Sequence, residues 1–203
     1  MEFTIMITNK AHLHHAEDIC SAMDEAAKAR GTGIAKRSPD YIRQKIEEGN
    51  AVIAFKVEKF AGFCYIESWD NGKYIANSGL IVAEEFRKSG LAKKIKAKIF
   101  HLSRKKFPEA KIFGITTSLA VMKINSELGY KPVTFSELTG DKSFWNSCQS
   151  CKNFDILIGN DCKMCLCTGM LYDPKAKRST FDFMKKSKVL KRLKKIEQRL
   201  FLQ

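Results

Sequence analysis

The stretch from Gly79 to Ala92, with the sequence GLIVAEEFRKSGLA, decides the fold of this chain. Its first part is a short apolar run, which is typical of a buried strand. It is followed by Arg87-x-x-Gly90-x-Ala92 at the start of a strongly helical run that continues to Lys106. Small residues keep side chains away from the backbone N–H groups of a helix N-terminus, and such groups bind phosphates. The stretch therefore predicts a strand, a phosphate-binding turn and a helix.

The pattern on both sides of this stretch is mixed α/β. Helical periodicity and turn residues predict helices at 12–30, 39–46, 90–106 and 119–128. Apolar or alternating runs predict strands at 3–8, 51–57, 61–69, 73–82, 111–117 and 130–138. The strands from residue 51 to 82 follow one another with short turns and form a meander. This order predicts an α/β (α+β) fold with a mixed sheet.

The motif and its surroundings resemble the GNAT N-acyltransferases, in which a strand is followed by R/Q-x-x-G-x-G/A at the start of a helix. The resemblance covers residues 3–138 and implies a GNAT fold that binds acetyl-CoA or another acyl-CoA, with succinyl-CoA as one possibility. It also implies that the strand lends backbone groups to the pantetheine chain and splays from the next strand. The cofactor-binding residues implied in this way are Leu80, Ile81, Val82, Arg87, Lys88, Ser89, Gly90, Leu91 and Ala92.

The catalytic residues are less clearly marked. Many GNAT enzymes have a tyrosine four residues before the glycine of an L-G-F/Y ending, where it protonates the departing thiolate. This sequence has Asn125 there, so the acid is not carried over, and Ser126 and Tyr130 are weak substitutes. Glu67, at the end of a central strand, is a candidate base for the attacking amine, directly or through water. The alternative is a solvated carboxylate at a strand end.

A basic loop lies between the first two helices, where this fold usually closes over the acceptor. Arg30, Lys36 and Arg37 flank two glycines and offer cationic groups suited to carboxylates. Together with the segments ANSGLIV, FGITTSLAVMKINSELGY and the cysteine cluster, the loop is similar to GNAT proteins associated with bacterial arginine biosynthesis. That resemblance implies N-acylation of a small amine, the amino group of glutamate. A solvated basic loop is the alternative.

Five of the seven cysteines crowd together after residue 147. Cys148-x-x-Cys151 and Cys162-x-x-Cys165 have the spacing with which four thiolates surround a tetrahedral Zn²⁺ ion. Clustered thiols of this kind favour metal over a disulfide scaffold. We therefore expect a structural zinc site formed by these four cysteines, with Cys167 as a spare ligand. Reduced cysteines without a metal are the alternative.

The net charge of +14 is unevenly distributed, because residues 175–203 contain eleven Lys and Arg residues but only Asp182 and Glu197 as acids. We expect a GNAT domain at 1–140, a cysteine-rich module at 141–174 and a basic amphipathic helical tail at 175–203. The tail makes a homodimer contact possible, and binding of nucleic acid is not expected from the domain itself. No apolar stretch approaches the length of a membrane span, and Met1 to Lys10 lacks the order of a secretory signal, which favours a cytoplasmic protein.

Two further functional hypotheses remain open from the sequence. One is a protein or tRNA acetyltransferase. The other is a non-catalytic adaptor that uses a GNAT scaffold to present the cysteine module and the tail to nucleic acid or protein. The absence of tyrosine at position 125 favours the adaptor, whereas the intact Arg87-x-x-Gly90-x-Ala92 motif favours the enzyme.

Overall fold

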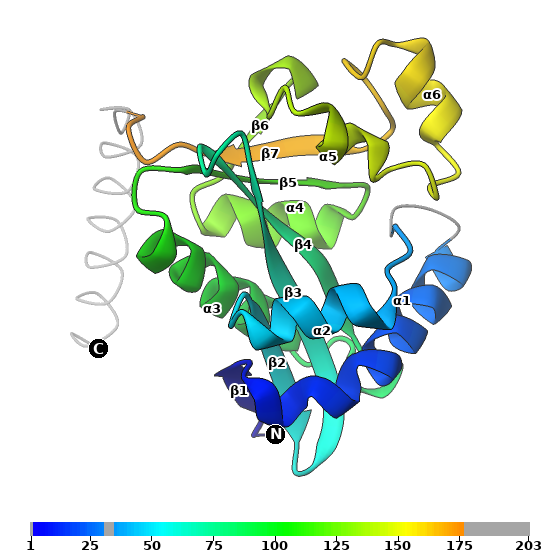
Figure 1. Ribbon diagram of the computed structural model, residues 1–203, viewed down its shortest axis with the longest axis vertical. Coiled ribbons are helices and arrows are strands. Elements are labelled where there is room, and N and C mark those ends of the chain that lie inside the picture. The colour runs from blue at the N-terminus through cyan, green and yellow to red at the C-terminus, as the bar shows by residue number, and fades with distance from the viewer. Residues whose placement is uncertain (1, 31–34, 177–203) are drawn as a thin grey trace, which may run out of the picture.

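A twisted seven-stranded sheet forms the centre of the molecule (Figure 1). The computed structural model describes residues 2–30 and 35–176. Across the sheet the strand order is β1-β2-β3-β4-β5-β7-β6, and every neighbouring pair is antiparallel except the parallel pair β4 and β5. The expected mixed α/β fold is thereby confirmed. The strands are β1 (Thr4–Ile7), β2 (Ala51–Lys56), β3 (Lys59–Trp69), β4 (Tyr74–Val82), β5 (Lys111–Thr116), β6 (Lys131–Val133) and β7 (Thr168–Tyr172).

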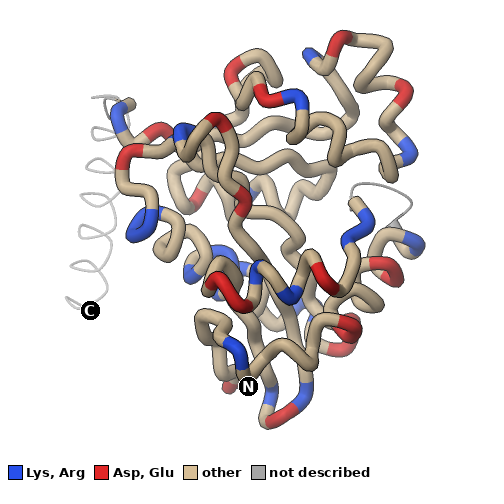
Figure 2. Tube along the Cα trace, viewed as in Figure 1, with Lys and Arg blue, Asp and Glu red and all other residues tan. Residues whose placement is uncertain are grey.

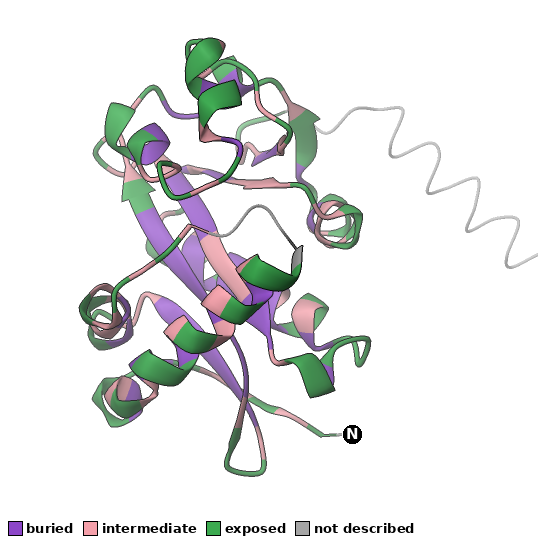
Figure 3. Ribbon diagram, turned by 90° about the vertical axis from the view of Figure 1, so that its right-hand side faces the viewer, coloured by how far each residue is buried: buried purple, intermediate pink, exposed green. Residues whose placement is uncertain are grey.

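Helices cover both faces of this sheet, so its central strands are buried on both sides (Figure 3). A 3₁₀ turn, η1 (Lys10–His15), leads into α1 (Ala16–Arg30), which packs with α2 (Pro39–Glu47) on one face. The opposite face carries α3 (Leu91–Lys106) and α4 (Leu119–Glu127). Strand β2 shows why both faces are apolar: Ile53 points to the α1–α2 side and Val52 to the α3 side.

Local sequence signals explain where the helices begin. Ser38 accepts a hydrogen bond from the backbone N–H of Tyr41, and Pro39 occupies the first turn of α2, as a helix start requires. In α4 the Ser118 hydroxyl accepts from the N–H of Val121 in the same way. Helix α3 instead begins after Gly90, which is left-handed at φ 80° and provides no side-chain cap.

The chain after β6 departs from the sequence-based expectation. The strand expected at 130–138 is limited to β6 and is followed by a 3₁₀ turn, η3 (Phe135–Glu137). Two short helices, α5 (Lys142–Asn146) and α6 (Phe154–Gly159), come next, and β7 then enters the sheet between β5 and β6. The sheet therefore extends to residue 172, and residues 134–167, here called the insertion, connect two of its strands.

Aromatic packing attaches the insertion to the sheet. Phe144 lies against Phe113 of β5 with ring centroids 4.9 Å apart, and Trp145 stacks on Phe135 at 5.1 Å. The indole N–H of Trp145 donates to the carbonyl of Thr139, so its polar atom is satisfied in a buried position. This cluster covers the same face of the sheet as α1 and α2, but over the β4, β5 and β7 half.

Acidic and basic residues are interspersed along the described chain (Figure 2). Most of the net positive charge belongs to the C-terminal segment, of which residues 177–203 lie outside the described residues. The expected helical tail, its dimer contact and any binding of nucleic acid therefore stay predictions. None of the helices that the structure describes has the length and apolar character needed to cross a bilayer.

Candidate active site

The site begins where the parallel strands β4 and β5 separate. Within the described chain, their pairing is confined to Tyr74–Ala76 opposite Lys111–Phe113. Gly79 marks the bend in β4, because its φ is +63° and a Cβ at this position would lie 2.2 Å from Cε1 of Tyr65. Only glycine fits there. The separation opens a pocket of about 160 Å³ between the two strand ends.

The turn between β4 and α3 presents open backbone N–H groups. A 3₁₀ turn, η2 (Glu84–Phe86), is held by the bond from the Arg87 N–H to the Glu84 carbonyl and by the Ser89 hydroxyl on the Phe86 carbonyl. In the described structure, no protein acceptor is found for the backbone N–H groups of Lys88 and of residues 90–93. A Cβ added to Gly90 would meet no atom within 4 Å. The corner is therefore open, as a phosphate-binding turn requires.

The predicted cofactor-binding residues take different positions around this corner. Leu80 lines the pocket, whereas the side chains of Ile81 and Val82 are buried on opposite faces of the sheet and leave only their backbone for a ligand. Leu91 is buried in the core, and Ala92 packs partly against it. Arg87 pairs with Glu84 at 3.6 Å, and Lys88 is exposed with a positive φ of 63°. Their roles toward an acyl-CoA stay predictions.

Glu67 and Arg37 come together at the pocket wall. Glu67 is only 4% exposed, which rules out the solvated strand-end alternative. Its carboxylate accepts a hydrogen bond from the Tyr41 hydroxyl and lies 3.5 Å from the Arg37 guanidinium. Arg37 also donates from Nε to the Tyr65 hydroxyl at 2.9 Å and from Nη1 to the Lys36 carbonyl. Burial, followed by the Glu67 charge, raises the pKa of Tyr41, so its phenol stays protonated.

The other two basic residues of the loop are placed differently. Lys36 is exposed, and its backbone N–H donates to the Ser150 hydroxyl of the insertion at 3.0 Å. This bond joins the loop before α2 to the insertion, and the pocket lies between them. Arg30 ends α1, next to residues 31–34, which are outside the described residues. Of the two predicted substrate-binding residues whose side chains the structure describes, Arg37 lines the pocket and Lys36 does not.

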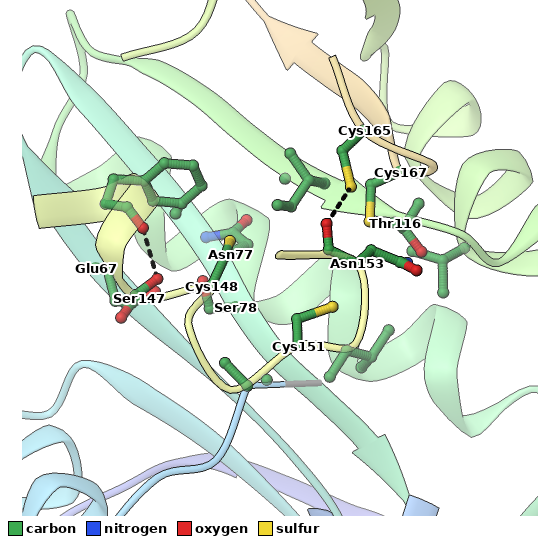
Figure 4. Close-up of a pocket in the computed structure, with 18 of the residues that line it drawn as sticks. Glu67, Asn77, Ser78, Thr116, Ser147, Cys148, Cys151, Asn153, Cys165 and Cys167 are labelled. Carbon is green, nitrogen blue, oxygen red and sulfur yellow. Dashed lines mark hydrogen bonds between the residues drawn. The ribbon is translucent and has the colours of Figure 1, made fainter. Parts of the chain in front are cut away.

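The cysteines of the insertion line the pocket, but in the described chain they are not grouped as a metal site requires. Cys148, Cys151, Cys165 and Cys167 line it (Figure 4), and Cys162 is not among its lining residues. No three His, Cys, Asp or Glu side chains of the described chain are grouped so that they could hold a metal ion. The expected zinc site is therefore not supported.

The surroundings of these sulfurs favour the thiol form. The Cys165 thiol lies 3.8 Å from the Asn153 carbonyl as a weak donor. Burial raises the pKa of Cys148 to about 11 and that of Cys167 to about 12, and the neighbouring cysteines add to both shifts.

The pocket also contains other polar groups, three of which the sequence patterns did not single out as functional. Asn77 of β4 and Lys96 of α3 line it, as does Asn153 of the insertion. The Oδ1 atom of Asn125 and the Nδ2 atom of Asn153 are buried without a hydrogen-bond partner in the described structure. Ser126, in contrast, is exposed and lies away from the pocket. Lys96 could have been found from its place beside the apolar stripe of α3.

No protein-family model matches this sequence, and no curated protein matches it. Solved structures do match. The chain is similar to the acetyltransferase of the GNAT family from Staphylococcus aureus Mu50, with a TM-score of 0.62 and 12% identity over 86% of this chain and 100% of that one. It is also similar to diaminobutyrate acetyltransferase EctA from Paenibacillus lautus, with a TM-score of 0.56 and 11% identity over 87% and 98%.

A third match is N-acetylglutamate synthase from Neisseria gonorrhoeae, determined with coenzyme A and N-acetyl-glutamate. Its TM-score is 0.60 and its identity 12%, over 87% of this chain. This chain spans only 36% of that protein, about a third of its length. At such low identities the likeness concerns the fold and not the substrate. Together with the splayed strands β4 and β5 and the open turn before α3, these matches show that the chain has the fold of the GNAT acetyltransferases.

Proposed function

We propose that this protein is an acyl-CoA-dependent N-acyltransferase. The observation that carries the proposal is the combination of three features: open N–H groups before α3, an edge of β4 that no longer pairs with β5 beyond Ala76, and a pocket at that edge that contains a buried carboxylate. The turn would hold the pyrophosphate, and backbone groups of residues 80–82 would hold the pantetheine chain. The thioester would then reach the pocket near Glu67.

The chemistry follows from the groups in the pocket. Glu67 accepts the proton that the attacking amine must lose, directly or through a water molecule. The Tyr41 hydroxyl and Arg37 hold the carboxylate in one orientation, so a single face of it is offered to the amine. Backbone N–H groups of β4 beside the thioester polarise its carbonyl as the oxyanion develops.

For the acceptor we propose a small amine, the amino group of glutamate, and for the donor acetyl-CoA or succinyl-CoA. Two observations support a carboxylate-bearing acceptor: Arg37 lines the pocket, and a structural neighbour is an N-acetylglutamate synthase. The nitrogens of Arg37 already have protein partners. A substrate carboxylate would therefore share this guanidinium with Glu67, which limits the affinity to a modest value.

Release of free CoA, measured with acetyl-CoA and succinyl-CoA, tests the function. The acceptor panel should contain glutamate, glutamine, a polyamine and a lysine-containing peptide. Turnover that requires glutamate supports the proposal, whereas turnover only with the peptide or the polyamine overturns the proposed acceptor. Thermal unfolding with and without CoA tests the cofactor separately, because a ligand that binds only the folded state must raise its stability.

Gly90→Ala tests the turn before α3. The new methyl group would project into the open corner, so we expect CoA affinity to fall by about tenfold, or roughly 1.4 kcal/mol. Gly72→Ala is the matched control, because Gly72 has φ +83°, close to the +80° of Gly90, and lies in the turn between β3 and β4. Both variants should lose about 1–2 kcal/mol of stability from the left-handed backbone. Equal CoA affinity in the two variants would place the pyrophosphate elsewhere.

A further inference from the structure

A buried lysine lies where β4 and β5 part. Lys96, in the second turn of α3, is 2% exposed and lines the pocket. Its Nζ donates to the Asn77 carbonyl at 3.1 Å. That carbonyl faces β5, since it lies 3.8 Å from the position of a Cβ on Gly114. Lys96 therefore donates a hydrogen bond to the first β4 carbonyl beyond the last residue pair that joins β4 to β5.

The side chains around Lys96 form hydrogen bonds with the Asn77 side chain but leave the Lys96 ammonium group without a counter-charge. The Asn77 amide donates to the Ser103 hydroxyl at 2.7 Å and accepts from the Tyr130 hydroxyl at 3.0 Å. The Tyr130 ring lies beside Lys96, with Nζ 5.8 Å from its centroid. Among the described residues, Lys96 forms no salt bridge, and the Asn77 carbonyl is the one hydrogen-bond acceptor of its three donors.

A buried ammonium without a counter-charge is costly, and an apolar side chain of similar length would fill the same space at no such cost. Burial lowers the pKa of Lys96, which makes it a stronger acid than a solvated lysine. Acyl transfer in this pocket would generate a negative charge on the sulfur of the departing thiolate. That charge would be the counter-charge that Lys96 lacks in the protein. Asn125, at the position where related enzymes have a tyrosine, has no proton to give.

We propose that Lys96 is the catalytic acid that protonates the sulfur of the departing CoA. The inference rests on the proposed function. The lone pair of the amine forms the C–N bond, the tetrahedral intermediate collapses, and the C–S bond breaks with its electron pair on sulfur. Sulfur takes a proton from Nζ of Lys96, and the amine nitrogen passes its proton to Glu67. Both groups then exchange protons with solvent, which restores their starting states.

The first test needs CoA alone and no acceptor. The thiol pKa of bound CoA is measured from the ultraviolet absorbance of its thiolate, with the complex of desulfo-CoA as the blank for the protein's own cysteines. An adjacent ammonium should hold the thiol pKa in the wild-type complex about one unit below that in Lys96→Met. Lys98→Met, an exposed lysine on the same helix, is the matched control and should behave as wild type.

The outcomes of this test are distinct. Equal thiol pKa values in wild type and Lys96→Met overturn the role of Lys96 while leaving CoA binding in place. No binding of CoA by the wild type overturns the proposed function, and this inference with it. If Lys96→Met fails to fold, Lys96→Gln replaces it: its amide is neutral but can still donate to the Asn77 carbonyl, so the thiol pKa should rise as in Lys96→Met. Lys96→Arg keeps the charge and should keep the thiol pKa low, but its guanidinium cannot release its proton.

The second test is kinetic. With an active acceptor, Lys96→Met and Lys96→Arg should both lower kcat by about 10²-fold or more, while the KM for acyl-CoA changes by less than about threefold. In wild type, kcat should fall as pH rises through the pKa of Lys96, and this limb should be absent from Lys96→Arg. A kcat within about threefold of wild type in both variants contradicts the proposal.

Discussion

At the scale of single residues, Glu67 shows how an ordinary carboxylate becomes a candidate base. Its place at the end of a strand leaves it almost fully buried, and two different groups hold it: the Tyr41 hydroxyl and the Arg37 guanidinium. A carboxylate held in this way is fixed in orientation but still has lone pairs that face the pocket. These lone pairs are the ones that the proposed role as a base would use.

Glu67→Gln keeps the size of the side chain and removes its charge. If Glu67 is the base, kcat should fall by about 10²-fold or more, because an amide cannot accept the proton. Glu58→Gln, an exposed glutamate in the turn between β2 and β3, provides the control. Steady-state kinetics of both variants decide the question, and equal rates would remove Glu67 from the proton path.

Cys64 gives a prediction about stability and pH. Its thiol is fully buried on the α3 side and donates to the Ser78 carbonyl at 3.2 Å, and burial raises its pKa from about 9.0 to about 11. The folded state therefore holds this proton longer than the unfolded state. The contribution of this thiol to the free energy of unfolding is fully present below pH 9. It is lost between pH 9 and 11, at up to about 1.4 kcal/mol per pH unit.

Urea unfolding of wild type and Cys64→Ala over this pH range checks that contribution. Below pH 9 the variant should be less stable by a constant amount, because it leaves a small cavity. Between pH 9 and 11 the difference in free energy of unfolding should narrow. In this range the thiol ionises in the unfolded wild type but not in the folded one, which lowers the stability of the wild type, and the variant has no thiol at this position. A difference that stays constant to pH 11 would contradict the raised pKa.

At the scale of elements, the position of β7 determines how the C-terminal part is held. The strand comes late in the chain, yet it lies between β5 and β6, with Met170 in the main core and Leu171 in the aromatic cluster under the insertion. The insertion is therefore tied to the sheet at both ends. Its short helices line the pocket wall and contribute Phe144, Trp145 and Leu157 to the aromatic cluster.

Met170→Ala measures the contribution of β7 to the core. Met170 is 1% exposed, so truncation should cost about 2–5 kcal/mol of unfolding free energy. Met164→Ala is the matched control, since Met164 lies in the insertion and is 58% exposed. We expect its effect to stay within about 0.5 kcal/mol. Denaturant unfolding compares the two, and similar small losses would mean that β7 is not part of the cooperative core.

Element prediction from the sequence succeeded where one local signal was sufficient. The helix starts at Ser38 and Gly90 and the meander from β2 to β4 follow from capping residues, turns and apolar runs. The strand expected up to Leu138 shrank to three residues, and β7 was missed. A five-residue strand flanked by cysteines and a Tyr-Asp-Pro turn has no periodicity long enough to be recognised, and its partners are distant in sequence.

At the scale of the whole molecule, the pocket is assembled from parts that are far apart in the chain. The loop before α2 contributes Arg37, the splayed strands contribute their edges, and the insertion contributes Cys148 and Asn153. The bond between the Lys36 N–H and the Ser150 hydroxyl joins two of these parts beside the pocket. A ligand in the pocket would contact all three.

The rate of alkylation of Cys148 tests whether a ligand occupies the pocket that these parts form. Its raised pKa of about 11 predicts slow reaction with iodoacetamide at pH 8, and bound acyl-CoA with acceptor should slow the reaction further by shielding the pocket. Cys20, on α1 and outside the pocket lining, is the control whose rate should not respond to ligand. Mass spectrometry of labelled peptides measures both rates. Equal protection of the two cysteines would indicate a general change in stability.

The sequence alone determined the fold class and the turn before α3, because both depend on short-range physics: apolar periodicity and small residues at a helix start. Tertiary structure alone decided the pairing of Glu67 with Arg37, the burial of Lys96 beneath Asn77 and the failure of the cysteines to converge on a metal. Such contacts depend on side-chain positions set by distant segments, and spacing along the chain does not encode them.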